Sequence, residues 1–390
     1  MSKDTRTTGK ELTIETLEGD LTIEEDATIT SPSDKIEIRG SATCDESVTF
    51  LKTLVAKNLT VSEDAVVQGD LLIANEVDCG GLLEVNGDCQ AREVDVGDQC
   101  EIHGSLTATE VDIGGRLVCD GLLDAKKVDI GGRLRVQGLK ARKVDVGGSF
   151  SATDAVDIRN LDVGGTAEMP SGGIVRAIDI GGVLEVGGSL TFQTLDVGGA
   201  AEIDGELIGN HVEIGGRIHV TGDTNLEESV EIGGKGLFEG TLQAENVDIG
   251  GKLAVHGDLL LSEDLEVGGS AEIRGTAQAA DVEVGSKLEV RKLKADSVEV
   301  GGKIVAQQFI YANHFEVGNH AKVVGTIIAD TIEIGQYSEV ESLIGRKIIL
   351  NQGVEVRGQV QYIDSLEDSK TVAYISEPEQ IEKLPAYDDL

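Results

Sequence analysis

The chain has 390 residues and a net charge of −38, and only 3% of its residues are aromatic. So acidic a chain is a poor match for nucleic acid phosphates and for adhesion to an anionic membrane by charge alone. With 51 glycines, 4 prolines and no tryptophan, the composition favours a narrow core of Val, Ile, Leu and Ala over a large globular one.

The first part of the chain is polar and then weakly periodic. Residues 1–10 are predicted to be a disordered polar N-terminus. Residues 11–76 alternate apolar and polar residues without regular glycines, which predicts irregular first coils of a β-helix. The start has no apolar segment of the secretory kind, and the chain has no run of about 20 apolar residues. We therefore expect a cytoplasmic protein.

A five-residue motif (apolar, acidic, apolar, Gly, usually Gly) dominates the chain from Val77 to Gln336. Neighbouring copies are 16 to 18 residues apart, most often 17. A fixed period this short is typical of a solenoid. The first glycine is always present, which predicts either φ > 0 or a close approach of two backbones at that position. The sixteen copies begin at Val77, Val94, Val111, Val128, Val144, Leu161, Ile178, Leu195, Val212, Val230, Val247, Leu265, Val282, Val298, Phe315 and Ile332.

Each period reads as one coil with three short sides. The alternation of period 2 continues beyond the motif and predicts the inward side chains Val128, Ile130, Leu134, Val136, Leu139 and Ala141. The predicted fold is all-β, a right-handed parallel β-helix of about 20 coils with a roughly triangular cross-section. Its regular 17-residue coils span 77–362, within a β-helix over 11–362.

Stacked motifs place their acidic residues in one outward column. The column should run from Asp78 to Glu333, with neighbours about 5 Å apart, a repulsive arrangement even in water. It is either a solvated stripe that prevents side-by-side aggregation, or a ladder that binds cations or a partner. Its candidate members are Asp112, Asp129, Asp145, Asp162, Asp179 and Asp196. Relief of the repulsion is expected from Arg116, Arg133, Arg217, Lys235, Lys252, Lys287 and Lys303.

Aromatic side chains concentrate late in the chain. Residues 363–390 break the period, which predicts a C-terminal cap over the last coil followed by an acidic tail. An alternative is that large side chains near this end form a contact between copies. The candidates for that polymer contact are Phe309, Tyr311, Phe315, Tyr337, Tyr362 and Tyr374.

No catalytic, metal or cofactor site is predicted. The six histidines are scattered without metal-site spacing, and no nucleophile elbow is present. The five cysteines all align with inward positions, which predicts small buried side chains and not ligands or disulfides.

The unit Leu-x-Ala-x-x-Val-Asp-Ile-Gly-Gly-x-Leu-x-Val-x-Gly resembles the bactofilin repeat. It runs here from Leu123 to Gly138, and the resemblance spans about residues 75–350. The family implies a right-handed β-helix that assembles end to end, without nucleotide, into nonpolar filaments. The length and acidity of this chain are closer to archaeal relatives, and the short apolar membrane-targeting start of typical members is not evident.

The sequence therefore predicts a structural cytoskeletal protein, not an enzyme. The expected partner is a second copy of the chain, with other cytoskeletal or membrane-associated proteins as further candidates and the membrane periphery as an alternative location. One competing hypothesis is a non-polymerising acidic scaffold or binding module. Others are a carbohydrate-active enzyme on a β-helix and an acidic mimic of nucleic acid.

Overall fold

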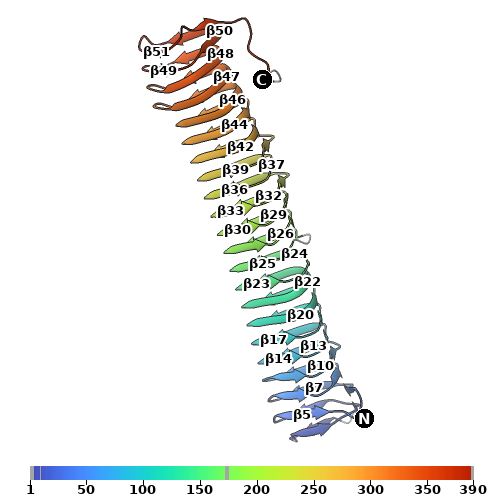
Figure 1. Cartoon of the computed structure of the whole chain (residues 1–390). Helices are drawn as coiled ribbons and strands as arrows, with labels where there is room; N and C mark the ends of the chain where they lie inside the picture. Colours follow the sequence, from blue (N-terminus) through green and yellow to red (C-terminus); the bar gives the residue numbers. More distant parts are fainter. Residues whose placement is uncertain (1–3, 9, 172–174, 388–390) are drawn as a thin grey trace. The chain divides into compact units, whose positions relative to one another are not determined.

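The computed structural model describes residues 4–8, 10–171 and 175–387, so part of the predicted disordered N-terminus and the end of the predicted acidic tail lie outside it. The chain comprises two compact units, residues 1–192 and 193–390. The described residues form 52 strands of a parallel β-solenoid of about 22 turns and contain no α-helix (Figure 1). The prediction of an all-β parallel solenoid is confirmed. Its right-handed winding and triangular section stay predictions.

Each regular coil contributes one strand to each of three parallel ladders. In the first unit, β13 (Glu76–Cys79), β14 (Leu82–Val85) and β15 (Cys89–Gln90) make one coil. They pair in register with the next coil, which is made of β16 (Glu93–Val96), β17 (Gln99–Ile102) and β18 (Leu106–Thr107). Strands of two to four residues are too short to persist alone, so the stacking of neighbouring coils stabilises each one.

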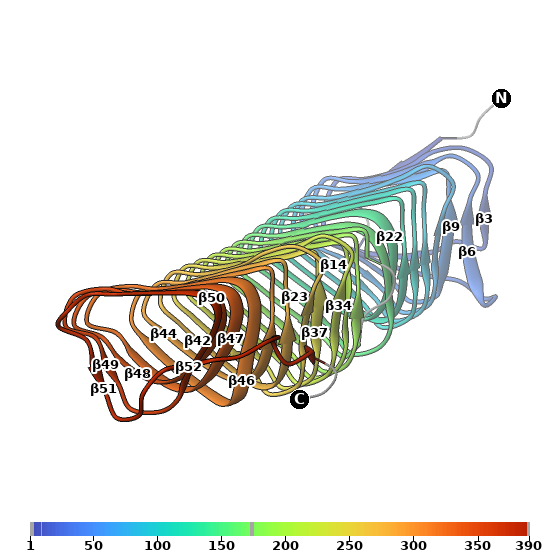
Figure 2. The same cartoon turned by 90° about the horizontal axis from the view of Figure 1, so that it is seen from above.

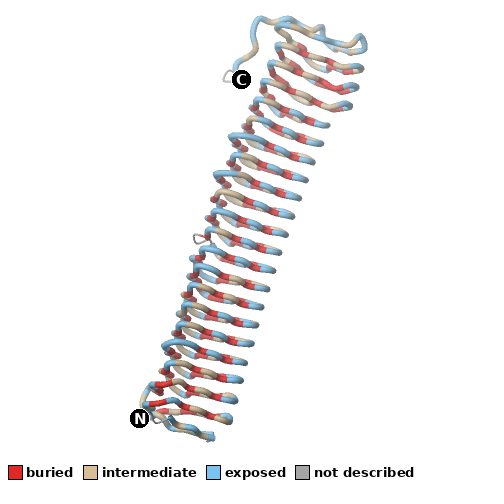
Figure 3. Tube along the Cα trace, turned by 180° about the vertical axis from the view of Figure 1, so that it is seen from behind, coloured by how far each residue is buried: buried red, intermediate tan, exposed pale blue. Residues whose placement is uncertain are grey.

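The core consists of the side chains that point inward at every second position of the strands. Val128, Ile130, Leu134 and Val136 are at most 1% exposed, and Leu139 and Ala141 are buried as well, so the predicted inward set is confirmed. Figure 3 shows buried residues alternating with exposed ones along the coils. Valine and isoleucine suit this pattern because a β-branched side chain packs well on a pleated, half-buried surface.

The second unit repeats the same ladders. Strand β35 (Ser229–Ile232) pairs with β32 (His211–Ile214) on one edge and with β38 (Asn246–Ile249) on the other. In the last coils the strands run on around their corners, as the stacked late coils in Figure 2 show. The longest strands of the second unit are β46 (Lys303–Val317), β47 (Lys322–Ile334) and β48 (Glu339–Leu350).

Strands lie beyond both predicted limits of the β-helix. In the first unit, β1 (Thr5–Thr7) pairs with β4 (Leu21–Ile23), so the first coil begins before residue 11. In the second unit, β50 (Val360–Asp368) continues past residue 362 and pairs with β48. Two further short strands, β51 (Ala373–Tyr374) and β52 (Glu379–Gln380), add to β49 (Glu355–Val356) and β50.

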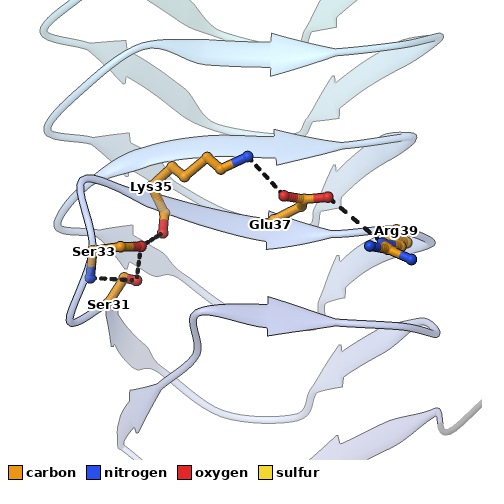
Figure 4. Close-up of polar contacts among 5 residues, drawn as sticks. All are labelled: Ser31, Ser33, Lys35, Glu37 and Arg39. Carbon is orange, nitrogen blue, oxygen red and sulfur yellow. Dashed lines mark hydrogen bonds and ion pairs between the residues drawn. The ribbon is translucent and has the colours of Figure 1, made fainter.

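A loop at residues 31–34 leaves the stack between β5 (Ala27–Thr30) and β6 (Lys35–Ile38). The Ser33 amide donates to Ser31 Oγ at 3.2 Å, and Ser33 Oγ donates to the Lys35 carbonyl at 3.0 Å (Figure 4). Just beyond it, the Glu37 carboxylate lies between Lys35 Nζ at 2.7 Å and Arg39 Nε at 3.6 Å. The hydrogen bond from Lys35 is the main cause of a lowered pKa at Glu37.

Candidate functional site

The acidic residues of the motif stack in register, one per coil. In the first unit the in-register pairs connect Asp78, Asp95, Asp112, Asp129, Asp145, Asp162 and Asp179. In the second unit, Asp196 begins a second run that continues through Glu213, Glu231, Asp248, Glu266, Glu283, Glu299, Glu316 and Glu333. Within each unit, the acidic residues of the motif are therefore in register from coil to coil.

Crowding along the column contributes to raised pKa values at two of its carboxyls. Partial burial, followed by the neighbouring Asp112 and Asp78, raises the pKa of Asp95. Partial burial, together with Asp145 and Asp179, likewise raises the pKa of Asp162. A raised pKa means that the folded chain holds these protons more tightly, because each neighbouring negative charge disfavours ionisation.

The cations that relieve the column are not the predicted ones. Within the described residues, Lys127 Nζ lies 3.9 Å from Asp129, and Lys143 Nζ lies 3.7 Å from Asp145. Each lysine precedes its carboxylate by two residues, so it projects from the same face of the same strand. The predicted Arg116 instead pairs with Glu101 at 3.7 Å, since it lies beyond the corner on another side of the coil.

The six aromatic candidates do not share one surface. Phe315 is fully buried and fills the core, whereas Tyr337 is 52% exposed at a corner and stacks on His320 with ring centroids 5.4 Å apart. Tyr362 and Tyr374 lie in the last coils of the second unit, in β50 and β51.

Phe309 and Tyr311 point outward and are covered by the tail. The Tyr387 ring packs edge-on against each of them, at 5.7 Å between centroids. Lys292 and Lys294 lie over the same group, with Lys294 Nζ 5.1 Å from the Tyr387 ring centre. The sequence gives little sign of this contact, because Tyr387 lies in the segment where the period has ended.

The terminal coils present strands that are paired on one edge. At one end of the first unit, β1, β2 (Glu11–Thr13) and β3 (Thr16–Leu17) each pair only with the following coil among the described residues. In the second unit, β51 and β52 each pair only with the preceding coil within the same described part. Leu12 and Leu17 are half-buried at the first edge, and Ile375 is 72% exposed at the second.

The cysteines are core residues. Cys44, Cys79, Cys89, Cys100 and Cys119 are all free and buried. In register, Cys100 lies beside Leu117, and Cys119 beside Val136, as predicted. Burial raises the pKa of the Cys89 thiol to about 12, so this thiol is a poor nucleophile and a poor metal ligand near neutrality. No cluster of three or more metal-ligating side chains occurs among the described residues.

Comparison with known proteins gives one result. The family model "Bactofilin: Polymer-forming cytoskeletal" matches residues 197–291, all within the second unit. No curated protein and no solved structure matches the chain. In the part of the chain that the structure describes, no helix has the length and apolarity to span a membrane. The chain is thus a β-solenoid protein with a bactofilin family domain, a structural protein of the polymer-forming cytoskeletal kind and not an enzyme.

Proposed function

We propose that this chain assembles end to end through its terminal coils, without nucleotide, into filaments that support cell shape or scaffold other proteins. The observation that supports this most directly is the set of half-paired strands, β1–β3 in the first unit and β51–β52 in the second. An open strand edge presents unpaired N–H and C=O groups and is a template for another strand.

Apolar side chains at the two edges supply the remaining driving force. Leu12 and Leu17 contribute at the first edge, and Leu366, Tyr374 and Ile375 at the second. The Tyr374 hydroxyl donates to Asp368 at 2.8 Å, which holds its ring in place against the last coil. Because backbone hydrogen bonds and apolar burial are enough for such a contact, no nucleotide enters it. Of the six aromatic candidates, Tyr362 and Tyr374 lie in β50 and β51, and this position supports a role for them in the contact.

Substitution at each edge tests the proposal. Leu12→Arg and Ile375→Arg each put a charge on one edge, and Leu72→Arg is the control, because Leu72 is 36% exposed in the interior coil strand β12 (Leu71–Ile73). Negative-stain microscopy should show filaments for the parent chain and for the control, and none for either edge variant.

The size of the particles that each edge variant forms reports the polarity of the filament. The nonpolar filaments implied by the family need like ends to meet, so blocking one edge should leave dimers in analytical ultracentrifugation. Monomers from both variants would mean head-to-tail assembly. Single particles of one length from the parent chain at every salt concentration would refute polymerisation and favour the non-polymerising acidic scaffold.

We further propose that the protein works in the cytoplasm, where other cytoskeletal or membrane-associated proteins bind it. Five free cysteines support this location, because a reducing compartment keeps thiols unpaired. Fluorescence imaging of a tagged chain in its host tests this. A diffuse or filamentous signal inside the cell is expected, and a signal outside the cell envelope would contradict it.

A further inference from the structure

One corner of the coil carries a column of cations in the first unit. This corner lies between the third strand of a coil and the motif strand that follows. Backbone hydrogen bonds link its residues from coil to coil, as from the Arg142 amide to the Lys126 carbonyl at 3.1 Å and from Arg176 to Arg159 at 3.0 Å. The register of the flanking residues aligns Arg142 with Arg159. Lys126, Arg142, Arg159 and Arg176 are therefore stacked over four successive coils, and all four are exposed.

These side chains line a groove and are not neutralised. The groove has a volume of about 380 Å³, and Lys140 adds a fifth cation to its wall. The carboxylates of Asp124 and Asp157 also line it, and the register places them on either side of Lys140. Within the described residues, none of the four corner cations makes an ion pair, although the chain has 71 acidic residues and 33 basic ones. Four unpaired cations on a chain with that excess of carboxylates suggest a site for an external anion.

The same corner is acidic in the second unit. There, Glu245 donates its amide to the Glu228 carbonyl at 2.7 Å, and Glu263 donates to Glu245 at 3.0 Å, so these three residues occupy successive coils. All three are exposed. Among the described residues, the charged side chains that line the groove beside them are Glu227 and Glu245, with no cation. Asp296 extends the acidic corner two coils further, beyond Ala280.

We infer that the basic corner of the first unit binds the acidic corner of the second unit of another copy, joining neighbouring solenoids side by side. The two columns have matching spacing. Both columns repeat once per coil, about 4.8 Å, because both are built from the same parallel ladders. An anionic column with this pitch can meet several of the cations at once. A single phosphate would engage one or two cations and leave the others unpaired.

Each ion pair across this contact is weak, but the free energies of many pairs add up along a polymer. Exposed ion pairs contribute little singly, but repeated contacts between two filaments act together. This contact lies on the sides of the solenoid and does not depend on how its ends meet. The corner contact is also distinct from the motif column, whose carboxylates lie on the adjacent strand and repel a second copy.

A charge swap tests the inference with the full-length chain. Arg142→Glu/Arg159→Glu reverses the two central cations of the basic corner, and Glu245→Arg/Glu263→Arg reverses two of the three glutamates of the acidic corner. Each variant alone should show side-by-side association weakened about tenfold or more at about 0.05 M salt. An equal mixture of the two should restore it, because each reversed corner then meets an opposite one. Light scattering and electron microscopy measure this association, and at about 1 M salt all samples should separate, since the screening length falls to about 3 Å.

A matched control keeps the same charge change away from the corner. Arg133→Glu/Arg135→Glu changes two exposed cations on another side of the same coils and should associate like the parent chain. Association that persists in the single corner variants, or a mixture that fails to restore it, would overturn the inference. So would tight binding of inorganic polyphosphate at the basic corner by a parent chain that shows no side-by-side association, because the groove would then be a phosphate site.

Discussion

The carbonyl oxygen of Gly114 lies 2.1 Å from the position that a Cβ atom would take on Gly131 in the next coil. The same approach recurs between Gly131 and Gly147, at 2.4 Å. Among the described glycines, only Gly325 and Gly353 have a positive φ. The first glycine of the motif is therefore required by lack of space between stacked backbones, and not by a left-handed conformation. Of the two reasons that the sequence suggests, close approach is the correct one.

Gly131→Ala should consequently destabilise the first unit. The added methyl group would meet a backbone oxygen that is fixed by the ladder, and overpacking of this kind costs about 1–3 kcal/mol. Gly138→Ala is the matched control, because its Cβ would meet its nearest atoms at an ordinary 3.5 Å. Urea unfolding followed by circular dichroism should show a lower midpoint for Gly131→Ala only. Equal midpoints for the two variants would contradict the steric explanation.

The period of the sequence determined much of the fold, since inward and outward positions follow from strict alternation. Val128, Ile130 and Leu134 lie where it predicts them, and the cysteines do too. The partner of Arg116 could not be predicted, because the direction of a side chain just beyond a corner depends on how sharply the backbone turns. The contact of Tyr387 with Tyr311 joins residues far apart in sequence, and no repeat encodes it.

The basic corner is another feature that was not predicted, although its residues follow the period of the sequence. Lys126, Arg142 and Arg159 are each 16 or 17 residues apart, so the period itself aligns them. The acidic position of the motif is the most regular charge in the coil, whereas the residue before the motif strand changes type from coil to coil. The charge at each position of the coil, compared between coils, identifies this second column.

The acidic column should make stability depend on pH in a defined direction. The pKa values of Asp95 and Asp162 are raised in the folded chain. The two carboxyls therefore contribute their full stabilisation when they are protonated, below their pKa of about 3.9 in the unfolded chain. This stabilisation is lost as the pH rises through their higher pKa in the folded chain. Asp95→Asn/Asp162→Asn should be more stable than the parent chain at pH 7, by about 0.5 kcal/mol per site, and this advantage should shrink toward pH 4.

Glu37→Gln provides a control of opposite sign. The pKa of Glu37 is lowered, chiefly by its hydrogen bond from Lys35, so its stabilising effect is present above the unfolded pKa and is lost as the pH falls. This variant should be less stable than the parent chain at pH 7 and equal to it at low pH. Urea midpoints at pH 4, 5, 6 and 7 measure both differences. An advantage of the double Asn variant that does not change over this range would rule out repulsion along the column as its cause.

Native cysteines should resist thiol reagents. Cys89 and Cys44 are 1% exposed, and burial raises the pKa of each thiol to about 12, so little thiolate forms at pH 8 and the reagent cannot reach it. A chromogenic disulfide reagent should report almost no reaction with the folded chain and five thiols per chain in denaturant. Ser262→Cys, at an exposed corner, should add one thiol that reacts rapidly in the folded state. Rapid labelling of the parent chain would show that the core opens.

Removing the Tyr387 ring should release the tail from the second unit. Edge-on contacts with Phe309 and Tyr311 contribute about 0.5–1.5 kcal/mol each, and cations over the rings add about 0.5–1 kcal/mol at exposed sites. Tyr387→Ala should therefore expose residues 381–387 to limited proteolysis and speed amide exchange in β46 near Phe309. The urea midpoint should change little, because the coils beneath remain stacked. Tyr387→Phe keeps the ring and loses only the hydroxyl, so it should protect the tail as the parent residue does. Equal cleavage of the parent chain and both variants would mean that the tail is released from this surface in solution regardless of the ring.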